Sequence, residues 1–347
     1  MTDLSRCANE AQPPLLSVVV PVHNEEQCID TFHGRTRAVL EEMPVRFEII
    51  YVNDGSRDRS LEYLLALRAE CSHVGVLDLS RNFGKEVAIS AGLDHASGDA
   101  VVIIDADLQD PPELIPSLFA RWQEGFDNVY AQRLSRAGET AMKRATAHAF
   151  YRILSRISEH EIPLDTGDFR LLSRRALIAL CALRERHRFM KGLYSWVGFR
   201  QIAVPYHREP RTGGRSAWSY WKLWNFSLEG ITSFSTLPLR VTSYAGLVVS
   251  ILAVLYGTFI TIRTLVYGNR VAGYPSLLVF ILFLGGLQLM SLGIIGEYLG
   301  RVFNETKHRP LYIVNSHWPS ALSAPPSLSR SGIAPTAAGA AVGWEKR

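Results

Sequence analysis

The chain has 347 residues, of which 47% are hydrophobic and 20% are charged, and its net charge is +4. This length allows one large domain or two smaller ones. Because basic residues barely exceed acidic ones, the composition argues against a nucleic-acid binder and against an acidic tail protein. The four cysteines are scattered without a CxxC pair, so neither a zinc site nor a disulfide framework is predicted, and we expect reduced thiols.

Short β-rich runs alternate with helix-like segments through residues 15–130. The pattern predicts strands at 15–21, 47–54, 74–81 and 100–107, and helices at 29–43, 59–71 and 84–98. Strands that alternate with helices indicate a parallel sheet covered by helices. We therefore expect an N-terminal arm at 1–14 and an α/β catalytic domain at 15–217.

A polar cluster follows each of the four predicted strands. In chain order the clusters read "HNEE", "NDGSRD", "SRNFGK" and "DADLQD". In open α/β sheets, ligands bind outside the carboxyl ends of the strands, so the four clusters together predict a ligand site there. The turn after the first strand contains no GxGxxG, which argues against an ordinary dinucleotide-dependent oxidoreductase.

Two late segments are apolar enough to cross a bilayer, at 243–262 and 274–296. Neither segment has a polar face, which argues against two core helices of a soluble protein. Basic residues flank the pair on both outer sides, at Lys222, Arg240, Arg301, Lys307 and Arg309, whereas the loop between the segments offers Arg263 and Arg270. This bias predicts a multi-pass protein whose catalytic domain is cytoplasmic.

Three further segments complete the predicted organisation. A basic amphipathic helix is expected at 141–158, with a stripe of Arg144, His148, Arg152 and Arg156, and it suits an anionic membrane surface. The alternative is an ordinary surface helix over the sheet. Residues 218–238 are rich in aromatic side chains and predict an interfacial helix, and residues 315–347 predict a disordered tail.

The segment "DADLQD" carries the most specific chemistry. Asp105 and Asp107 are separated by one residue just beyond a strand, and Gln109 offers a third oxygen. Carboxylate and amide oxygens suit Mg²⁺ or Mn²⁺, which usually also holds substrate phosphates. A lone DxD is a weak signal, but with Glu25 and Asp54 at neighbouring strand ends it describes an acidic pocket for a metal and a nucleotide diphosphate.

Several motifs together resemble those of family 2 glycosyltransferases. They are "VVVPVHNEE", "YVNDGSRDRS", "LSRNFGKEVAISAGL", "DADLQDPPE", "DTGDFRLLSRRAL", "ERHRFMKGLYSWVGF", "YWKLWNFSLEGITSFSTLPLR" and "GEYLGR" with "RPLY". More narrowly, the chain resembles polyprenyl-phosphate glycosyltransferases of the bactoprenol glucosyltransferase and dolichol-phosphate mannosyltransferase type. The resemblance covers residues 15–314 and leaves out the N-terminal arm and the tail.

The resemblance implies a GT-A fold and an inverting transfer of a sugar, expected to be glucose from UDP-glucose, to undecaprenyl or another polyprenyl phosphate. The cofactor would be Mg²⁺ or Mn²⁺. The protein would be an inner-membrane homo-oligomer that works at the cytoplasmic face and serves cell-surface glycans such as lipopolysaccharide. The implied donor-binding residues are Pro21, His23, Glu25, Asp54, Asp105, Ala106, Asp107, Arg133, Arg211 and Arg215. The implied acceptor-binding residues are Arg152 and Arg170, the metal ligands Asp105, Asp107 and Gln109, and the catalytic residues Asp168 and Asp107.

Two features leave the roles of single residues open. The second pKa of a phosphate lies near about 6, so the nucleophile is largely deprotonated at neutral pH and needs no strong base. Asp168 could therefore take part in the reaction directly or hold Arg170 or a loop in place. In addition, Ala217 stands where relatives carry a Lys that covers the donor phosphates, and Arg215 and Lys222 are the candidates to replace it.

Three alternatives remain. The same chemistry could use GDP-mannose, UDP-GlcNAc or UDP-aminoarabinose as the donor. A processive polysaccharide synthase is disfavoured, because the chain has no QxxRW motif and only two predicted spans. A non-enzymatic scaffold for a membrane flippase is disfavoured by the intact DxD.

Overall fold

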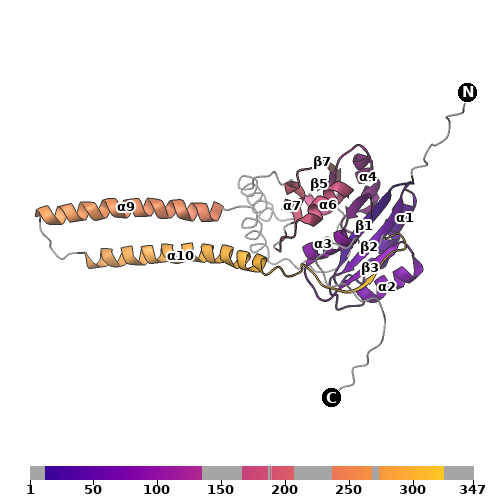
Figure 1. Cartoon of the computed structure of the whole chain (residues 1–347), viewed down its shortest axis with the longest axis horizontal. Coiled ribbons are helices and arrows are strands. Elements are labelled where there is room, and N and C mark those ends of the chain that lie inside the picture. The colour runs from indigo at the N-terminus through magenta and orange to yellow at the C-terminus, as the bar shows by residue number, and fades with distance from the viewer. Residues whose placement is uncertain are drawn as a thin grey trace, which may run out of the picture.

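The computed structural model describes residues 12–134, 166–186, 188, 190–206, 237–267 and 273–323. These residues form an α/β domain, from which two long helices extend side by side (Figure 1). The first strand begins at Leu15, where the sequence predicted the domain to begin.

An eight-stranded sheet forms the centre of the domain. Its strands are β1 (Leu15–Val22), β2 (Arg46–Asn53), β3 (Val74–Leu79), β4 (Ala100–Ile103), β5 (Asn128–Arg133), β6 (Thr166–Ser173), β7 (Gln201–Tyr206) and β8 (Val314–Trp318), in the order β7-β5-β6-β4-β1-β2-β3-β8. β6 runs antiparallel to β4 and β5, and β8 runs antiparallel to β3, so the sheet is mixed where the sequence predicted a parallel one. The central strands β1 to β4 are parallel and almost continuously apolar, as strands covered on both faces must be.

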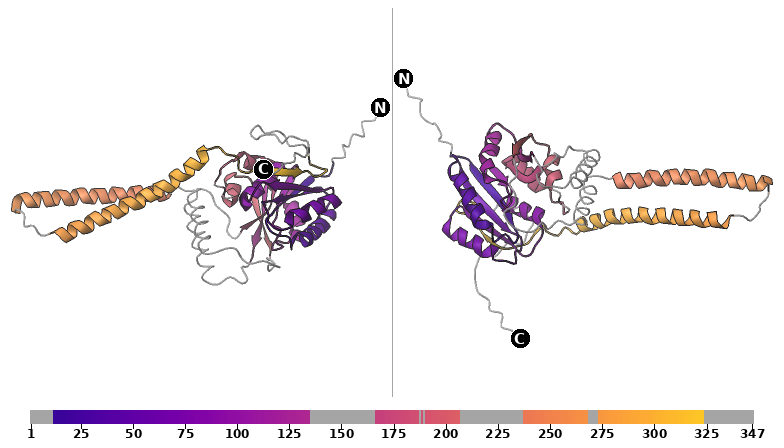
Figure 2. Two further views of the ribbon diagram at one scale, coloured as in Figure 1. Left: turned by 90° about the horizontal axis from the view of Figure 1, so that it is seen from below. Right: turned by 180° about the vertical axis from the view of Figure 1, so that it is seen from behind.

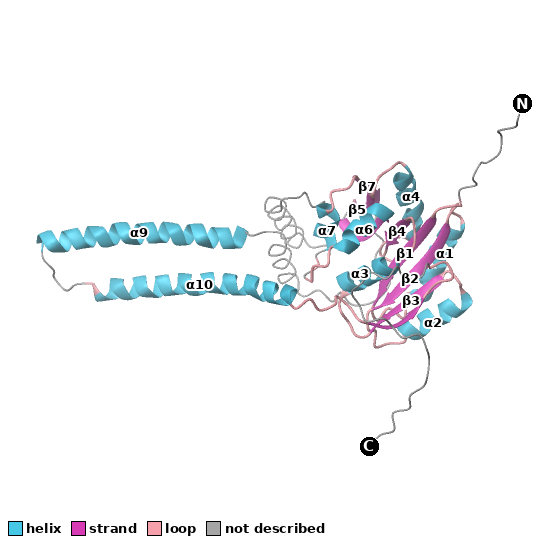
Figure 3. Ribbon diagram, in the orientation of Figure 1, coloured by secondary structure: helices cyan, strands magenta, loops and turns pink. Residues whose placement is uncertain are grey.

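Helices cover both faces of the sheet (Figure 3). One core cluster packs α1 (Ile29–Glu41), α2 (Ser60–Glu70), the short helix η1 (Pro112–Leu114) and α4 (Ile115–Gln123) on one face. The other packs α3 (Lys85–His95), α6 (Arg174–Ala182) and α7 (Met190–Trp196) on the opposite face. In this three-layer arrangement the polar clusters lie beyond the carboxyl ends of β1 to β4.

The first four strands and the three helices between them agree with the prediction to within a few residues, except that β4 ends at Ile103. β5, β6 and β7 were not predicted. Buried polar groups, among them Asn128 and Asp168, interrupt the apolar residues of β5 and β6, and β7 is only partly buried, so the sequence lacks a clean strand pattern there.

The two extended helices are α9 (Leu237–Tyr267) and α10 (Tyr274–Thr306), of 31 and 33 residues. At 1.5 Å per residue each is about 46–50 Å long, which exceeds the ~30 Å hydrocarbon core of a bilayer. They run antiparallel, and the rings of Tyr256 and Phe280 lie 5.8 Å apart between them. Figure 2 shows the pair projecting from the domain in two further views. In the described residues one stretch, Phe283–Thr306, is long and apolar enough to cross a membrane, and Thr242–Tyr256 is a shorter apolar stretch. The two predicted spans therefore stay a prediction.

After α10 the chain returns to the sheet. Strand β8 pairs with β3, and Asn315 donates a hydrogen bond from Nδ2 to Asp78 Oδ2 at 2.7 Å. Beyond the strand, Ser320 and Ser323 each donate to the buried carboxylate of Glu48 at 2.8 Å. The disordered tail was predicted to begin at Asn315, which is too early, because residues 314–323 are held by the sheet edge and by Glu48. β7 and β8 are thus the two outer strands, and α9 and α10 lie between them in the sequence.

Candidate active site

The structure brings the four strand-end segments together. A ring nitrogen of His23, after β1, lies 2.8 Å from the carbonyl oxygen of Asp54, after β2. Asn82, after β3, places its side-chain nitrogen 3.0 Å from the other ring nitrogen of His23. The backbone N–H of Arg57 donates to Asn24 at 2.8 Å. These contacts join the loops into one surface at the carboxyl edge of the sheet.

Asp54 fixes the loop that precedes α3. Its side chain is buried and accepts hydrogen bonds from the backbone N–H groups of Phe83 at 2.7 Å and Gly84 at 2.9 Å. Gly84 has φ +99°, a conformation that glycine adopts without strain. Asp54 therefore positions the start of α3, and its contact with the donor stays a prediction.

The acidic segment after β4 alternates between the surface and the core. Asp105, Asp107 and Gln109 are partly exposed, whereas Ile104, Ala106 and Leu108 are buried. The backbone N–H of Gln109 donates to Asp107 Oδ1 at 3.1 Å, and Leu108 has φ +59°. Because the Ala106 side chain lies in the core, only the backbone of Ala106 is available to a donor.

Lys85 joins two of the predicted site residues. Its Nζ lies 2.7 Å from Asp105 Oδ2 and 2.6 Å from Asp168 Oδ2. Burial raises the pKa of Asp105, and the nearby Lys85 only partly opposes this effect. At Asp168 burial also works against ionisation, but Lys85 and Lys191 outweigh it and hold the pKa of Asp168 below its usual range. The sequence pointed to Lys85 only as a member of the "SRNFGK" cluster.

Glu86 lies next to this group at the start of α3. Burial and the charge of Asp168 raise the pKa of Glu86 to about 8. The backbone N–H of Met190, the first residue of α7, donates to Glu86 Oε2 at 3.2 Å. At neutral pH the carboxyl group of Glu86 is therefore mostly protonated, and it accepts a hydrogen bond from the first residue of α7.

Arg133 lies at the end of β5 in a network that the sequence did not reveal. Its Nε donates to the Tyr206 hydroxyl oxygen at 3.2 Å, and its Nη2 lies 3.7 Å from Asp110 Oδ1. The Tyr206 hydroxyl in turn donates to the buried carboxylate of Asp110. A Cβ on Gly167 would lie 2.9 Å from Arg133 Nη2, so the guanidinium packs against the residue before Asp168. The predicted contact of Arg133 with a phosphate stays a prediction.

Arg170, which the sequence predicted to contact the acceptor, is held by contacts inside the domain, and its contact with the acceptor stays a prediction. Arg170 is only 4% exposed, its Nη2 donates to the Gly167 carbonyl at 3.0 Å, and its guanidinium lies 3.6 Å above the ring of Tyr194. These contacts hold Arg170 to the strand that also carries Asp168. The alternative role of Asp168, to hold Arg170 or a loop in place, likewise stays a prediction.

Some predicted residues lie outside the described residues. They are Arg152 with the predicted helix at 141–158, Arg211, Arg215, Ala217 and most of the aromatic segment at 218–238. Their predicted roles stay predictions. Pro21, His23 and Glu25 lie at the end of β1 and in the loop that follows it, beside the acidic segment.

The donor set at the acidic segment fits a hard cation in part. Within the described ranges, no group of three or more His, Cys, Asp or Glu side chains is arranged to hold a metal ion. Two carboxylates and one amide, from Asp105, Asp107 and Gln109, lie at alternate positions of one segment and are partly exposed. Mg²⁺ and Mn²⁺ are commonly bound by one or two carboxylates, with phosphate and water completing the shell. The site therefore fits a metal ion that arrives with a diphosphate.

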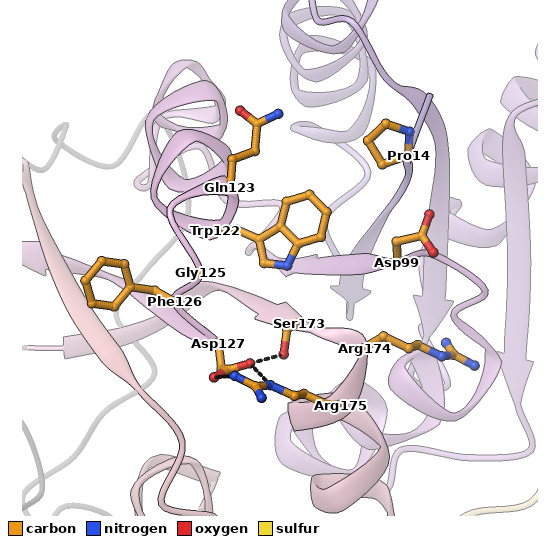
Figure 4. A pocket seen from close by; sticks show the side chains of 10 residues that line it. All are labelled: Pro14, Asp99, Trp122, Gln123, Gly125, Phe126, Asp127, Ser173, Arg174 and Arg175. Carbon is orange, nitrogen blue, oxygen red and sulfur yellow. Dashed lines mark hydrogen bonds and ion pairs between the residues drawn. The ribbon is translucent and has the colours of Figure 1, made fainter. Parts of the chain in front are cut away.

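A separate pocket of about 700 Å³ lies at the opposite edge of the sheet (Figure 4). It is lined by Pro14, Asp99, Trp122, Gln123, Gly125, Phe126, Asp127, Ser173, Arg174 and Arg175. Asp127 is already engaged by Arg175 and by the Ser173 hydroxyl, and Asp99 accepts from the backbone N–H of Leu15. The carboxylates of this pocket already have partners within the domain. The pocket also lies at the amino ends of β1, β4 and β5, so it does not belong to the candidate site at the carboxyl ends of the strands.

A helix-covered, mixed sheet with acidic and basic side chains gathered at the carboxyl ends of its parallel strands is the arrangement in which open α/β domains bind ligands. The family model for glycosyl transferase family 2 matches residues 17–181. Among known proteins, an uncharacterized glycosyltransferase of Synechocystis sp. is 53% identical over 87% of this chain and 95% of its own length. The bactoprenol glucosyl transferase of Shigella phage SfV is 51% identical over 87% and 98%, and a prophage homolog in Escherichia coli K12 is 48% identical over 86% and 98%.

The chain therefore belongs to glycosyl transferase family 2, it is an enzyme, and the resemblance to the polyprenyl-phosphate branch of that family is confirmed. The mixed α/β sheet is GT-A-like. Among solved structures, glucosyl-3-phosphoglycerate synthase from Mycobacterium tuberculosis, in complex with Mn²⁺, UDP-glucose and phosphoglyceric acid, is 21% identical over 63% of this chain and 78% of that one, with a TM-score of 0.45.

Proposed function

We propose that this enzyme transfers glucose from UDP-glucose to undecaprenyl phosphate with inversion at the sugar, using Mg²⁺ or Mn²⁺. The observation that carries the proposal is the acidic segment with its three partly exposed oxygen donors, set in a domain that continues into a long apolar helical pair. The names of the relatives, bactoprenol glucosyl transferases at about half identity along nearly their whole length, support the choice of sugar and acceptor.

The chemistry divides among the residues of the site. An oxygen of the acceptor phosphate bonds to C1 of the sugar while the bond from C1 to the nucleoside diphosphate breaks. A divalent cation would neutralise the charge that develops on the leaving diphosphate. Asp105, Asp107 and Gln109 would hold that cation, and Asp168 would face the reacting centre. Because a phosphate monoester is largely deprotonated above about pH 6, Asp168 need not remove a proton.

The helical pair supports a lipid acceptor. Large apolar side chains along both helices are exposed, among them Leu247, Val254 and Phe259 on α9, and Leu289 and Leu292 on α10. Contiguous exposed apolar surface of this extent marks a protein or membrane contact. We propose that α9 and α10 cross the inner membrane as a hairpin, that the catalytic domain is cytoplasmic, and that the acceptor presents its phosphate at the interface. We also propose that the protein is a homo-oligomer and that its product serves lipopolysaccharide or other surface glycans.

The test is a transfer assay with purified protein, undecaprenyl phosphate and a panel of radiolabelled nucleotide sugars. We expect label from UDP-glucose in the lipid fraction, and none from GDP-mannose, UDP-GlcNAc or UDP-aminoarabinose. A different active donor would correct the sugar but keep the reaction class. Absence of transfer from every donor would overturn the proposal.

The metal is tested separately. EDTA should abolish transfer, and Asp107→Asn should lower the rate by about 100-fold or more, because a ligand that stabilises the leaving group is weakened. Asp30→Asn, which changes an exposed carboxylate on α1, is the matched control and should retain the wild-type rate. Transfer that survives both EDTA and the Asp107 substitution would exclude the metal mechanism.

A further inference from the structure

Lys85 bridges Asp105 and Asp168, to which the proposed function gives different roles. Asp105 would bind the metal, and Asp168 would face the reacting centre. Asp105 comes from the segment after β4, and Asp168 comes from the start of β6. One ammonium group lies within 2.7 Å of a carboxylate oxygen of each. The side chain of Lys85 is 44% exposed, whereas that of Asp168 is 10% exposed, so Lys85 reaches from the surface to a largely buried carboxylate.

The backbone around Lys85 is held firmly, but its side chain has room to move. Asp54 binds the two backbone N–H groups just before Lys85, and the Arg81 guanidinium lies 4.1 Å above the ring of Phe83. Lys85 is also the first residue of α3. Its position along the chain is therefore fixed, while four rotatable bonds allow Nζ to change partners.

The second oxygen of Asp168 shows that the bridge is incomplete. Among the residues that the structure describes, no group forms a hydrogen bond to the buried Oδ1 of Asp168, although Oδ2 is held by Lys85. A buried carboxylate oxygen without a partner is unfavourable, and such a group commonly waits for a ligand or a rearrangement. We therefore expect the contacts of Lys85 and Asp168 to rearrange when substrates bind.

A divalent cation bound to Asp105 would be repelled by an ammonium group on the same carboxylate. Like charges a few ångströms apart repel, and the repulsion is larger in a partly buried site than in water. When a metal takes Asp105, Lys85 must give up that contact. Asp168 is then the carboxylate that still holds it.

On this geometry, and resting on the proposed function, we propose that Lys85 is a resident cation that exchanges with the metal. In the donor-free enzyme it holds Asp105 and Asp168 together. When metal and donor diphosphate occupy Asp105, Lys85 stays on Asp168 and turns its freed N–H bonds to an oxygen of the acceptor phosphate. Lys85 remains protonated throughout, and its part is to bind and orient the anionic nucleophile beside C1 of the sugar.

The proposal predicts that one substitution moves two measurements in opposite directions. Lys85→Met should bind Mn²⁺ alone about fivefold or more tightly, because the competing cation is gone. The same variant should lose about 100-fold in kcat/KM for undecaprenyl phosphate, because the acceptor loses a charged donor. Mn²⁺ binding is measured by electron paramagnetic resonance of the free ion, with and without UDP, so this readout does not depend on activity.

Two further variants make the experiment decisive. Lys307→Met removes the same charge from the C-terminal end of α10 and should leave both measurements at wild-type values. Lys85→Arg keeps a cation that can reach both carboxylates, so Mn²⁺ affinity should stay near wild type and acceptor use should be partly retained. If Lys85→Met is poorly folded, as judged by circular dichroism, the Arg variant still decides, because a tighter Mn²⁺ site in it would overturn the exchange.

The outcomes separate this proposal from the proposed function. Weaker or unchanged Mn²⁺ binding in Lys85→Met would show that the lysine is only structural and would overturn the exchange. Unchanged acceptor use would overturn its role toward the phosphate. If the wild-type enzyme transfers no sugar to any polyprenyl phosphate, the proposed function fails and the acceptor role fails with it, whereas the Mn²⁺ measurement still decides the exchange.

Discussion

At the scale of single residues, Glu86 shows how the site combines charges of both signs in a small volume. Desolvation of its half-buried carboxyl group and the charge of Asp168 raise the pKa of Glu86 from its ordinary 4.5 to about 8. The folded protein therefore keeps a proton that the unfolded chain releases at a lower pH. Stability gained from this proton is fully present below about pH 4.5 and is lost as the pH rises through 8.

The prediction is that Glu86→Gln flattens this loss. Glutamine keeps a carbonyl oxygen for the Met190 N–H but cannot ionise, so the variant should become increasingly more stable than wild type between pH 5 and pH 8. Thermal unfolding in detergent, followed by circular dichroism across this range, measures the difference. Glu42→Gln, at the exposed C-terminal end of α1, controls for the loss of one acidic side chain. A constant difference at every pH would contradict the assignment.

The residue scale also shows the limit of sequence reasoning. Asp105, Asp107 and Gln109 could be proposed as metal ligands from the sequence, because all three lie in one short segment that directly follows a buried strand. The contact between Lys85 and Asp168 could not be predicted from the sequence. The two residues are far apart in the chain, and they come together only because β6 lies beside β4 in the sheet. The same holds for Asp110, Tyr206 and Arg133, which come from three separate elements.

At the scale of elements, the segment after α10 illustrates a strand defined by its partner. The sequence "VNSHW" has little alternation and precedes a stretch rich in Ser, Ala and Pro, so composition favoured a disordered tail. The open edge of β3 supplies the hydrogen bonds that make residues 314–318 a strand. The strands β1 to β4 were predictable for the opposite reason, since their burial on both faces leaves a continuous apolar run.

Glu48 is the anchor of this segment, and its removal should release it. The carboxylate is fully buried and accepts hydrogen bonds from Ser17, the Ser97 N–H, Ser320 and Ser323. Glu48→Ala should lower the free energy of unfolding by about 3 kcal/mol, since one hydrogen bond to a charged group contributes about 1.5–3 kcal/mol and several donors lose their partner.

Hydrogen exchange gives the local readout for this substitution. The backbone of residues 314–323 should exchange faster in Glu48→Ala, while the centre of β1 stays protected. Glu42→Ala removes an exposed carboxylate and should change neither region. Unaltered exchange in residues 314–323 would mean that strand pairing alone holds the segment.

At the scale of the whole molecule, the helical pair is longer than a bilayer core requires, and its basic residues are concentrated toward the catalytic domain. Arg301, Lys307 and Arg309 lie at the domain end of α10 or just beyond it, whereas Arg263 lies near the far end of α9. Under the positive-inside rule this distribution favours a cytoplasmic catalytic domain with the turn between the helices outside.

Labelling of a single cysteine tests this topology. Tyr267, at the exposed far end of α9, is changed to Cys in a chain whose native cysteines are replaced by alanine. An impermeant thiol reagent should label this residue in intact cells. Glu42→Cys on the catalytic domain should be labelled only after lysis. Labelling of Tyr267→Cys only after lysis would exclude the two-span hairpin.

The return of the chain to β3 has a consequence for how the protein is made. A ribosome releases the first seven strands before either long helix, and the eighth strand only after both. Until then the edge of β3 is an unpaired strand edge, a surface prone to wrong pairing. The last strand of the catalytic sheet can therefore pair only after both long helices have been synthesised. A chain truncated before β8 would carry every residue of the candidate site and still expose an open sheet edge to the cell's proteases and chaperones.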